Sequence, residues 1–194
     1  MPLLTALFAT ALLMALGLSV VLLGSAETTL ASHDRDARAL AYAARAAAAI
    51  AAADLRALPS WTLIASPGLV PEVSATPGRF VDSTLAPEAP WRGPPLDLRA
   101  LTVRLQAESD AADLSGDPAP AWRLFDYGPL ARLAPDASAR NPYYLVVWVA
   151  SENGTIVTRA VAYGPGDGRS IVEVSVVRQP DTDQPRILTI RPVA

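Results

Sequence analysis

The residue types that carry out most protein chemistry are scarce in this chain. Of its 194 residues none is cysteine, one is histidine (His33), and all 16 basic residues are arginine. Without cysteine there are no disulfides, thiolate metal sites or cysteine nucleophiles. His33 lies in a charged run with Asp34, Arg35 and Asp36, which is typical of a solvated helix face rather than of a metal ligand. We therefore expect no catalytic site, no metal site and no cofactor.

Two short glycine-containing motifs have simpler explanations than ligand binding. Gly164, Gly166 and Gly168 have a spacing that could suit a phosphate-binding loop, but they lie between two predicted strands, whereas phosphate loops open a helix. The run Asn153–Thr155 (NGT) matches a glycosylation sequon, but Asn-Gly is also the strongest short hairpin signal. We interpret both segments as hairpin loops.

Charge indicates no general class of partner. The 16 basic and 19 acidic residues give a net charge of −3, which provides no broad attraction to nucleic acid or anionic lipid. The acids Asp110, Asp113 and Asp117 lie in one loop-like stretch and favour surface solvation or, weakly, calcium binding. No nucleic-acid partner and no small-molecule substrate are evident. The composition favours a structural or interaction protein over an enzyme.

The first 26 residues dominate the organisation of the chain. Pro2–Ala26 contains no ionisable side chain, and a helix of about 25 residues is roughly 37 Å long, enough to cross a hydrocarbon core of about 30 Å. Three interpretations exist: a permanent membrane anchor, a secretory signal cleaved after Ala26, or a buried core helix. We favour the anchor, because the run is long and lacks a basic n-region, and because a core helix without a polar face needs a large protein around it.

A second helical stretch, Glu27–Leu58, contains no glycine or proline and is rich in alanine, the best helix former. We expect it to continue the first stretch, which would give a helix of about 84 Å with Gly17 and Gly24 as its weak points. Its apolar positions recur every three or four residues: Leu30, Ala37, Leu40, Ala44, Ala47, Ala51, Leu55 and Leu58. This stripe packs either against another helix or against a sheet of the chain itself.

The rest of the chain divides into a proline-rich part and a β-rich part. Residues 59–142 hold 13 of the 18 prolines, with a helix predicted near 97–112, Asp97 as its N-cap, and a strand at Trp122–Tyr127. Residues 143–194 alternate with a period of two and predict an antiparallel meander. Its strands are Tyr143–Ala150, Thr155–Tyr163, Ser170–Arg178 and Arg186–Arg191.

The predicted fold class is α+β. A long N-terminal helix, membrane-spanning in its first half and amphipathic in its second, packs on a C-terminal antiparallel sheet of about four strands. The expected divisions are residues 1–26, 27–58, 59–142 and 143–194. The arginines nearest the apolar run, Arg35, Arg38 and Arg45, lie on its C-terminal side, so the positive-inside rule alone would place the body in the cytoplasm.

Several runs of residues carry a family likeness. They are Leu7–Phe8, Ala15–Gly17, Val21–Leu23, Glu27–Thr28, Leu30–Ser32, Arg35–Asp36 and Ala39–Ala44, with looser agreement at Trp122–Leu130, Tyr143–Val149 and Ala162–Gly166. In these runs the chain resembles PilX-type minor pilins, which are components of bacterial type IV pilus assembly related to the pseudopilins of type II secretion. The likeness is good over residues 7–45 and looser beyond them.

The resemblance implies a mature pilin-like subunit. In that family the N-terminal helix lies in the bacterial inner membrane with a periplasmic α/β head, and then packs in the core of a filament at the cell surface. A prepilin peptidase cuts a basic leader just before the apolar run, which would remove the charges on which an orientation argument depends. The chain departs from major pilins at Thr5, where they carry a glutamate, and this favours a minor or priming subunit.

The expected partners are membrane lipid and other pilin subunits, contacted through helix–helix packing. We expect the membrane and filament contacts at Phe8, Leu12, Leu16, Val20 and Leu23, extended by a helix-packing stripe at Leu30, Ala37, Ala44 and Ala51. The main alternative is a single-span envelope protein whose periplasmic head binds a partner or ligand and never enters a filament. A third interpretation is a secreted domain released by cleavage after Ala26.

Overall fold

The computed structural model of this chain describes residues 2–58, 61, 80–91, 93–112, 120–133, 142–152, 154–178 and 185–193. Some predicted features lie outside these residues, namely Asp113, Asp117, Asn153, residues 62–79 of the proline-rich segment and the connection at 180–184. The chain divides into two units, Met1–Ala39 and Leu40–Ala194, and the second unit is called the head below.

One helix, α1 (Pro2–Ala57), makes up the first unit and continues into the head. Its 56 residues form an unbroken α-helix, about 84 Å long at 1.5 Å per residue. The two glycines predicted as weak points, Gly17 and Gly24, do not interrupt it, and a Cβ atom at either position would meet nothing within 4 Å. The predicted continuity of the two helical stretches is therefore what the structure shows.

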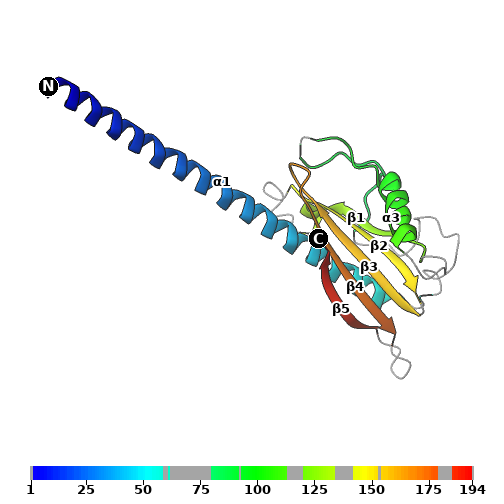
Figure 1. Ribbon diagram of the computed structural model, residues 1–194. Helices are drawn as coiled ribbons and strands as arrows, with labels where there is room; N and C mark the ends of the chain where they lie inside the picture. The colour runs from blue at the N-terminus through cyan, green and yellow to red at the C-terminus, as the bar shows by residue number, and fades with distance from the viewer. Residues whose placement is uncertain are drawn as a thin grey trace. The chain divides into compact units, whose positions relative to one another are not determined.

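The head contains a five-stranded antiparallel sheet in the order β1-β2-β3-β4-β5, so every strand pairs with its neighbour in sequence (Figure 1). The strands are β1 (Arg123–Pro129), β2 (Tyr144–Glu152), β3 (Thr155–Tyr163), β4 (Arg169–Arg178) and β5 (Pro185–Val193). The α+β class and the antiparallel meander are confirmed. The sheet exceeds the expected four strands because β1, which matches the strand predicted at Trp122–Tyr127 outside the meander, pairs with β2 at its edge.

One face of the sheet is covered by the part of α1 that lies in the head (Figure 1). On this face Val147, Ala160 and Val172 lie in register across β2, β3 and β4, and all three are buried. The buried residues of α1 are Leu40, Ala43, Ala44, Ala47, Ala48, Ala51, Ala52 and Leu55. Alanine at most of these positions keeps side chains short, so the helix axis can approach the sheet closely.

The opposite face is covered by a second helix, α3 (Leu98–Ala112), as predicted near 97–112 (Figure 1). Leu98 and Leu105 are buried in a cluster that includes Trp148. The indole Nε1 of Trp148 donates a hydrogen bond of 2.8 Å to Thr102 Oγ1, which fixes α3 on β2. The backbone N–H of Ala100 donates to Asp97 Oδ1 at 2.9 Å, so the predicted N-cap is confirmed.

The described glycines of the two motifs lie in connections between strands. In the β3–β4 loop the Gly164 N–H donates to the Gly168 carbonyl at 2.8 Å, which closes the loop as a hairpin. Gly166 has a φ of 64° and Gly154, in the β2–β3 turn, a φ of 78°, a backbone conformation that glycine adopts without steric strain. The hairpin interpretation of the glycine-rich run is confirmed, because the loop joins two strands and opens no helix.

Replacing Ala51 with phenylalanine is expected to destabilise the head by about 3 kcal/mol, because overpacking a filled core forces backbone shifts. Ala51 is 0% exposed beneath the sheet. The measurement is thermal unfolding of the full chain in detergent, where the midpoint should fall by about 6 to 12 °C. Ala53→Phe is the matched control, since Ala53 is exposed on the same helix. An equal fall of the unfolding midpoint in the two variants would contradict the packing of α1 on the sheet.

Candidate functional site

The apolar surface of α1 in the first unit is the strongest candidate for a functional surface. The five residues predicted to make membrane and filament contacts are all exposed: Phe8 66%, Leu12 64%, Leu16 56%, Val20 70% and Leu23 62%. Their neighbours Leu13 and Met14 are exposed to the same degree or more. The structure therefore does not set the five residues apart. It shows a helix that is apolar on all sides, as in membrane spans and in the cores of large assemblies.

This stretch fits a bilayer by length and composition. Its most apolar 18-residue window has a mean hydropathy of 2.5, and none of that window is buried within the described part of the chain. The core-helix interpretation is therefore wrong, because a core helix is covered by its own protein. What remains is one N-terminal helix that is long and apolar enough to cross a membrane, consistent with an anchor or a signal sequence.

Two hydroxyl groups of this stretch donate hydrogen bonds to its own backbone. Thr10 donates to the Leu7 carbonyl at 2.9 Å, and Ser19 donates to the Ala15 carbonyl at 2.8 Å. A polar group without a hydrogen-bond partner is costly in hydrocarbon, so these internal bonds reduce the penalty of placing hydroxyl side chains in lipid. The side chain of Thr5 lies outside what the structure describes.

The polar segment that follows the apolar stretch is a solvated helix face, as the sequence predicts for the region around His33. His33 is exposed, and Arg38 forms an exposed ion pair with Asp34 at 2.8 Å across one helical turn. Among the described residues no group of three or more histidine, cysteine, aspartate or glutamate side chains is placed to hold a metal ion.

The predicted helix-packing stripe is divided between the two units. Leu30 and Ala37 are exposed, whereas Ala44 and Ala51 are each 0% exposed. The second pair faces the sheet of the chain itself and is not accessible to another helix. Of the two alternatives for this stripe, packing on the chain's own sheet therefore holds from Leu40 onward.

An apolar groove lies on the head beside α1. It has a volume of about 360 Å³ and runs between Ala48 and Ala52 of α1 and Val174 and Ile190 of the sheet. Ile190 belongs to the edge strand β5 and is 60% exposed. The sequence did not predict this groove, because the pairing of β5 with β4 determines which of its apolar residues are covered.

A buried carboxyl group lies between α1 and the sheet. Asp126 of β1 is 3% exposed, and its Oδ2 has no hydrogen-bond partner among the described residues. A β-bulge between Leu124 and Asp126 shifts the alternation of β1, which turns Asp126 toward the face that α1 covers. Burial, and then the negative charge of Asp54 on α1, raise the pKa of Asp126 to about 7. Sequence analysis missed this group, since simple alternation places Asp126 on the same face as Leu124.

Charged side chains form a row on the face of the sheet that α3 covers. Arg159, Glu173 and Arg191 lie in register across β3, β4 and β5. Glu173 is the central acid: Arg191 Nη2 lies 2.7 Å from its Oε2 and Arg159 Nη1 lies 3.9 Å from its Oε1. Sequence analysis missed this row. The charged residues inside the alternating strands could have indicated such a row, but the strand register decides which of them lie next to one another.

Comparisons with protein-family models, with curated proteins and with solved structures found no match to this chain. Its architecture, a long N-terminal apolar helix packed on a C-terminal antiparallel sheet, is pilin-like. The features of the described residues that bear on function are the exposed apolar surface of α1 and the groove, the buried acid and the charged row of the head.

Proposed function

We propose that this chain is a minor pilin-like subunit of a type IV pilus or a related filament. In this proposal the apolar stretch Pro2–Ala26 of α1 lies in the inner membrane before assembly and packs against the matching helices of other subunits afterwards, while the head lies outside. The observation that carries the proposal is that one unbroken helix has an exposed, wholly apolar N-terminal part and a C-terminal part buried under the sheet.

The exposed apolar surface is too extensive for a helix that remains in water. Monomeric soluble proteins rarely expose contiguous apolar patches larger than a few hundred Å², and larger ones mark membrane or protein contacts. Every large apolar side chain from Leu3 to Leu23 is more than half exposed. Lipid or other apolar helices are the environments that remove such a surface from water.

Small residues on one face of α1 support packing against other helices in addition to anchoring. Gly17 and Gly24 lie seven residues apart, on one face of α1, with open space around them. Small residues on one face allow close approach of a second helix.

The resemblance of residues 7–45 to PilX-type minor pilins supports the same proposal from the sequence. The alternative of an anchored head that never enters a filament shares the membrane helix and differs only in what α1 contacts. Contact between α1 helices is therefore the property to test.

Single-cysteine cross-linking provides this test, because the chain has no native cysteine. We expect Leu16→Cys to form disulfide-linked adducts with a cysteine placed in a co-assembled pilin helix, within filaments sheared from cells. The measurement is a non-reducing immunoblot of the sheared fraction. Ala53→Cys is the matched control, since Ala53 lies in the head and is expected to form no such adduct.

Two outcomes would overturn the proposal. A chain that remains entirely in the membrane fraction and forms no Leu16→Cys adduct would be a single-span envelope protein. A mature chain that begins at Glu27, determined by mass spectrometry, would be a secreted domain released by signal cleavage.

A further inference from the structure

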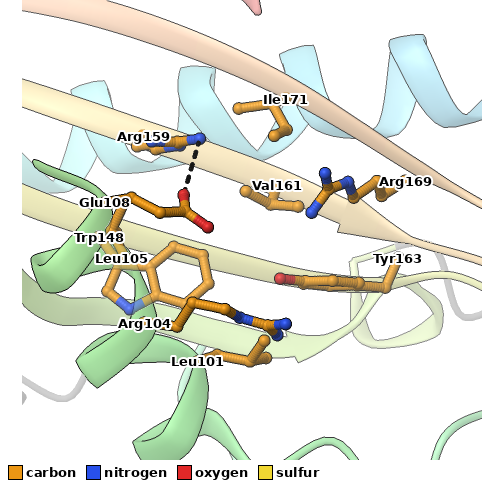
Figure 2. A pocket seen from close by; sticks show the side chains of 10 residues that line it. All are labelled: Leu101, Arg104, Leu105, Glu108, Trp148, Arg159, Val161, Tyr163, Arg169 and Ile171. Atoms are coloured by element: carbon orange, nitrogen blue, oxygen red, sulfur yellow. Dashed lines mark ion pairs between the residues drawn. The ribbon is translucent and has the colours of Figure 1, made fainter. Parts of the chain in front are cut away.

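A small cavity opens on the face of the sheet that α3 covers, between α3 and strands β3 and β4 (Figure 2). Its volume is about 40 Å³. Leu105, Trp148 and Val161 line it with apolar surface. The cavity has room for one small chemical group, while the rest of any ligand would remain outside.

Three arginines from three different elements line this cavity. Arg104 comes from α3, Arg159 from β3 and Arg169 from β4, and Figure 2 shows their guanidinium groups around its edge. The one acid among the lining residues is Glu108, whose Oε2 lies 3.9 Å from Arg159 Nη2. Arg159 is also 3.9 Å from Glu173, so its charge is already balanced within the head.

Arg104 and Arg169 are different, because neither has an ion-pair partner among the described residues. Both side chains are exposed at the cavity. Guanidinium groups bind carboxylate and phosphate oxygens in a bidentate geometry. Two unpaired guanidinium groups at the edge of a cavity sized for one group favour an oxyanion as the ligand.

Tyr163 provides a neutral donor between these arginines. It lies opposite Arg169 in the β3–β4 register, and Figure 2 shows its hydroxyl directed inward toward the other lining side chains. Burial raises the pKa of Tyr163, while the positive charges of Arg104, Arg169 and Arg159 act in the opposite direction. The net direction is upward, so the phenol keeps its proton at neutral pH and can donate it in a hydrogen bond.

We propose that Arg104, Arg169 and Tyr163 form a binding site for a single oxyanion group, a carboxylate or a phosphate. Arg104 and Arg169 supply charge from opposite sides, and the Tyr163 hydroxyl donates from within. The apolar side chain of Trp148 forms one wall of the cavity beside these groups. The site lies in the head and does not depend on membrane anchoring or on filament assembly.

The test is thermal unfolding of the full chain in detergent, monitored by tryptophan fluorescence. The unfolding midpoint is measured at increasing concentrations of sodium phosphate or of sodium acetate. Sodium chloride keeps the ionic strength constant and is also the control salt. We expect a saturable rise in the unfolding midpoint, because a ligand that binds the folded state stabilises it. A rise with phosphate alone identifies a phosphoryl-bearing ligand, and a rise with acetate alone identifies a carboxylate.

Three variants define the site. Arg104→Gln combined with Arg169→Gln is expected to weaken binding roughly 10- to 100-fold, and Tyr163→Phe about 5-fold, as for loss of charged and neutral hydrogen bonds. Glu108→Gln is expected to tighten binding roughly 3- to 10-fold, because it removes the competing carboxylate. The matched control, Arg99→Gln with Arg186→Gln, removes the same charge from exposed positions that do not line the cavity.

The proposal is wrong if neither anion raises the midpoint above the chloride control. It is equally wrong if the Arg104→Gln, Arg169→Gln variant and its matched control respond to the same extent, since that result reflects general screening of a positively charged surface. A Glu108→Gln variant that binds more weakly than the unmodified chain would also overturn it.

Discussion

Replacing Leu16 with arginine is expected to exclude the chain from sheared filaments while the head remains folded. Leu16 lies near the middle of the charge-free stretch Pro2–Ala26 and is 56% exposed. In the proposed function its side chain contacts lipid before assembly and the helices of other subunits afterwards. An arginine at the centre of a membrane helix is unfavourable by about 3 kcal/mol. An unpaired charge buried between packed helices adds several more. Both penalties oppose the helix packing that the proposed filament requires.

The measurement is an immunoblot of sheared filaments and of membranes from cells that express each variant. Leu16→Ala is the control, because it keeps the position apolar and is expected to enter filaments. Folding of the head is followed separately by fluorescence, since all four tryptophans follow residue 58 in the sequence. If Leu16→Arg appears in sheared filaments at the level of the unmodified chain, α1 is not the assembly element.

Replacing Asp126 with asparagine is expected to stabilise the head at pH 8 and to change its stability little below pH 4. The pKa of Asp126 is raised to about 7 in the folded chain from an ordinary value of 3.8. Between these values the folded state holds a proton that the unfolded state has released, so stability falls as pH rises from about 4 to about 7. Above pH 7 the penalty is constant. Asparagine removes this penalty, so the free energy of unfolding at pH 8 is expected to rise by on the order of 2 to 4 kcal/mol.

Denaturant unfolding of the full chain in detergent at pH 4, 6 and 8 measures this effect. The quantity to compare is the difference in unfolding free energy between Asp126→Asn and the unmodified chain, since groups that do not interact with Asp126 cancel in that difference. Glu88→Gln is the control, because Glu88 is exposed and surface substitutions usually change stability by less than about 0.5 kcal/mol. A difference that is the same at all three pH values would show that Asp126 is not buried as an acid.

Much of the fold could be predicted because its signals are local. The absence of charge from Pro2 to Ala26 and the absence of proline between Pro2 and Pro59 are sufficient to predict one long helix. Alternation after Tyr143 and short glycine-rich turns predict strands that pair with their neighbours in sequence. The edge position of β1 was not predicted, because residues 134–141 and earlier loops give no indication of where an isolated strand will pair.

The chemical features of the head could not be predicted because they depend on register and on packing between distant segments. Asp126 faces α1 only because a bulge in β1 shifts its alternation. Arg104 and Arg169 are 65 positions apart in the sequence, and they line one cavity because α3 lies across β3 and β4. The available signals were the charged residues that interrupt alternating strands, but these do not indicate which charges meet.

The sequence by itself determined where the chain is apolar, where it is helical and which strands are neighbours, since each of these properties depends on residues within a few positions of one another. Only the tertiary structure decided that the stripe on α1 changes its role at Leu40, exposed at Ala37 and buried at Ala44. The residues on both sides of this boundary have the same type and spacing. What differs is whether the sheet lies against them, and the sheet begins at Arg123, 79 positions after Ala44.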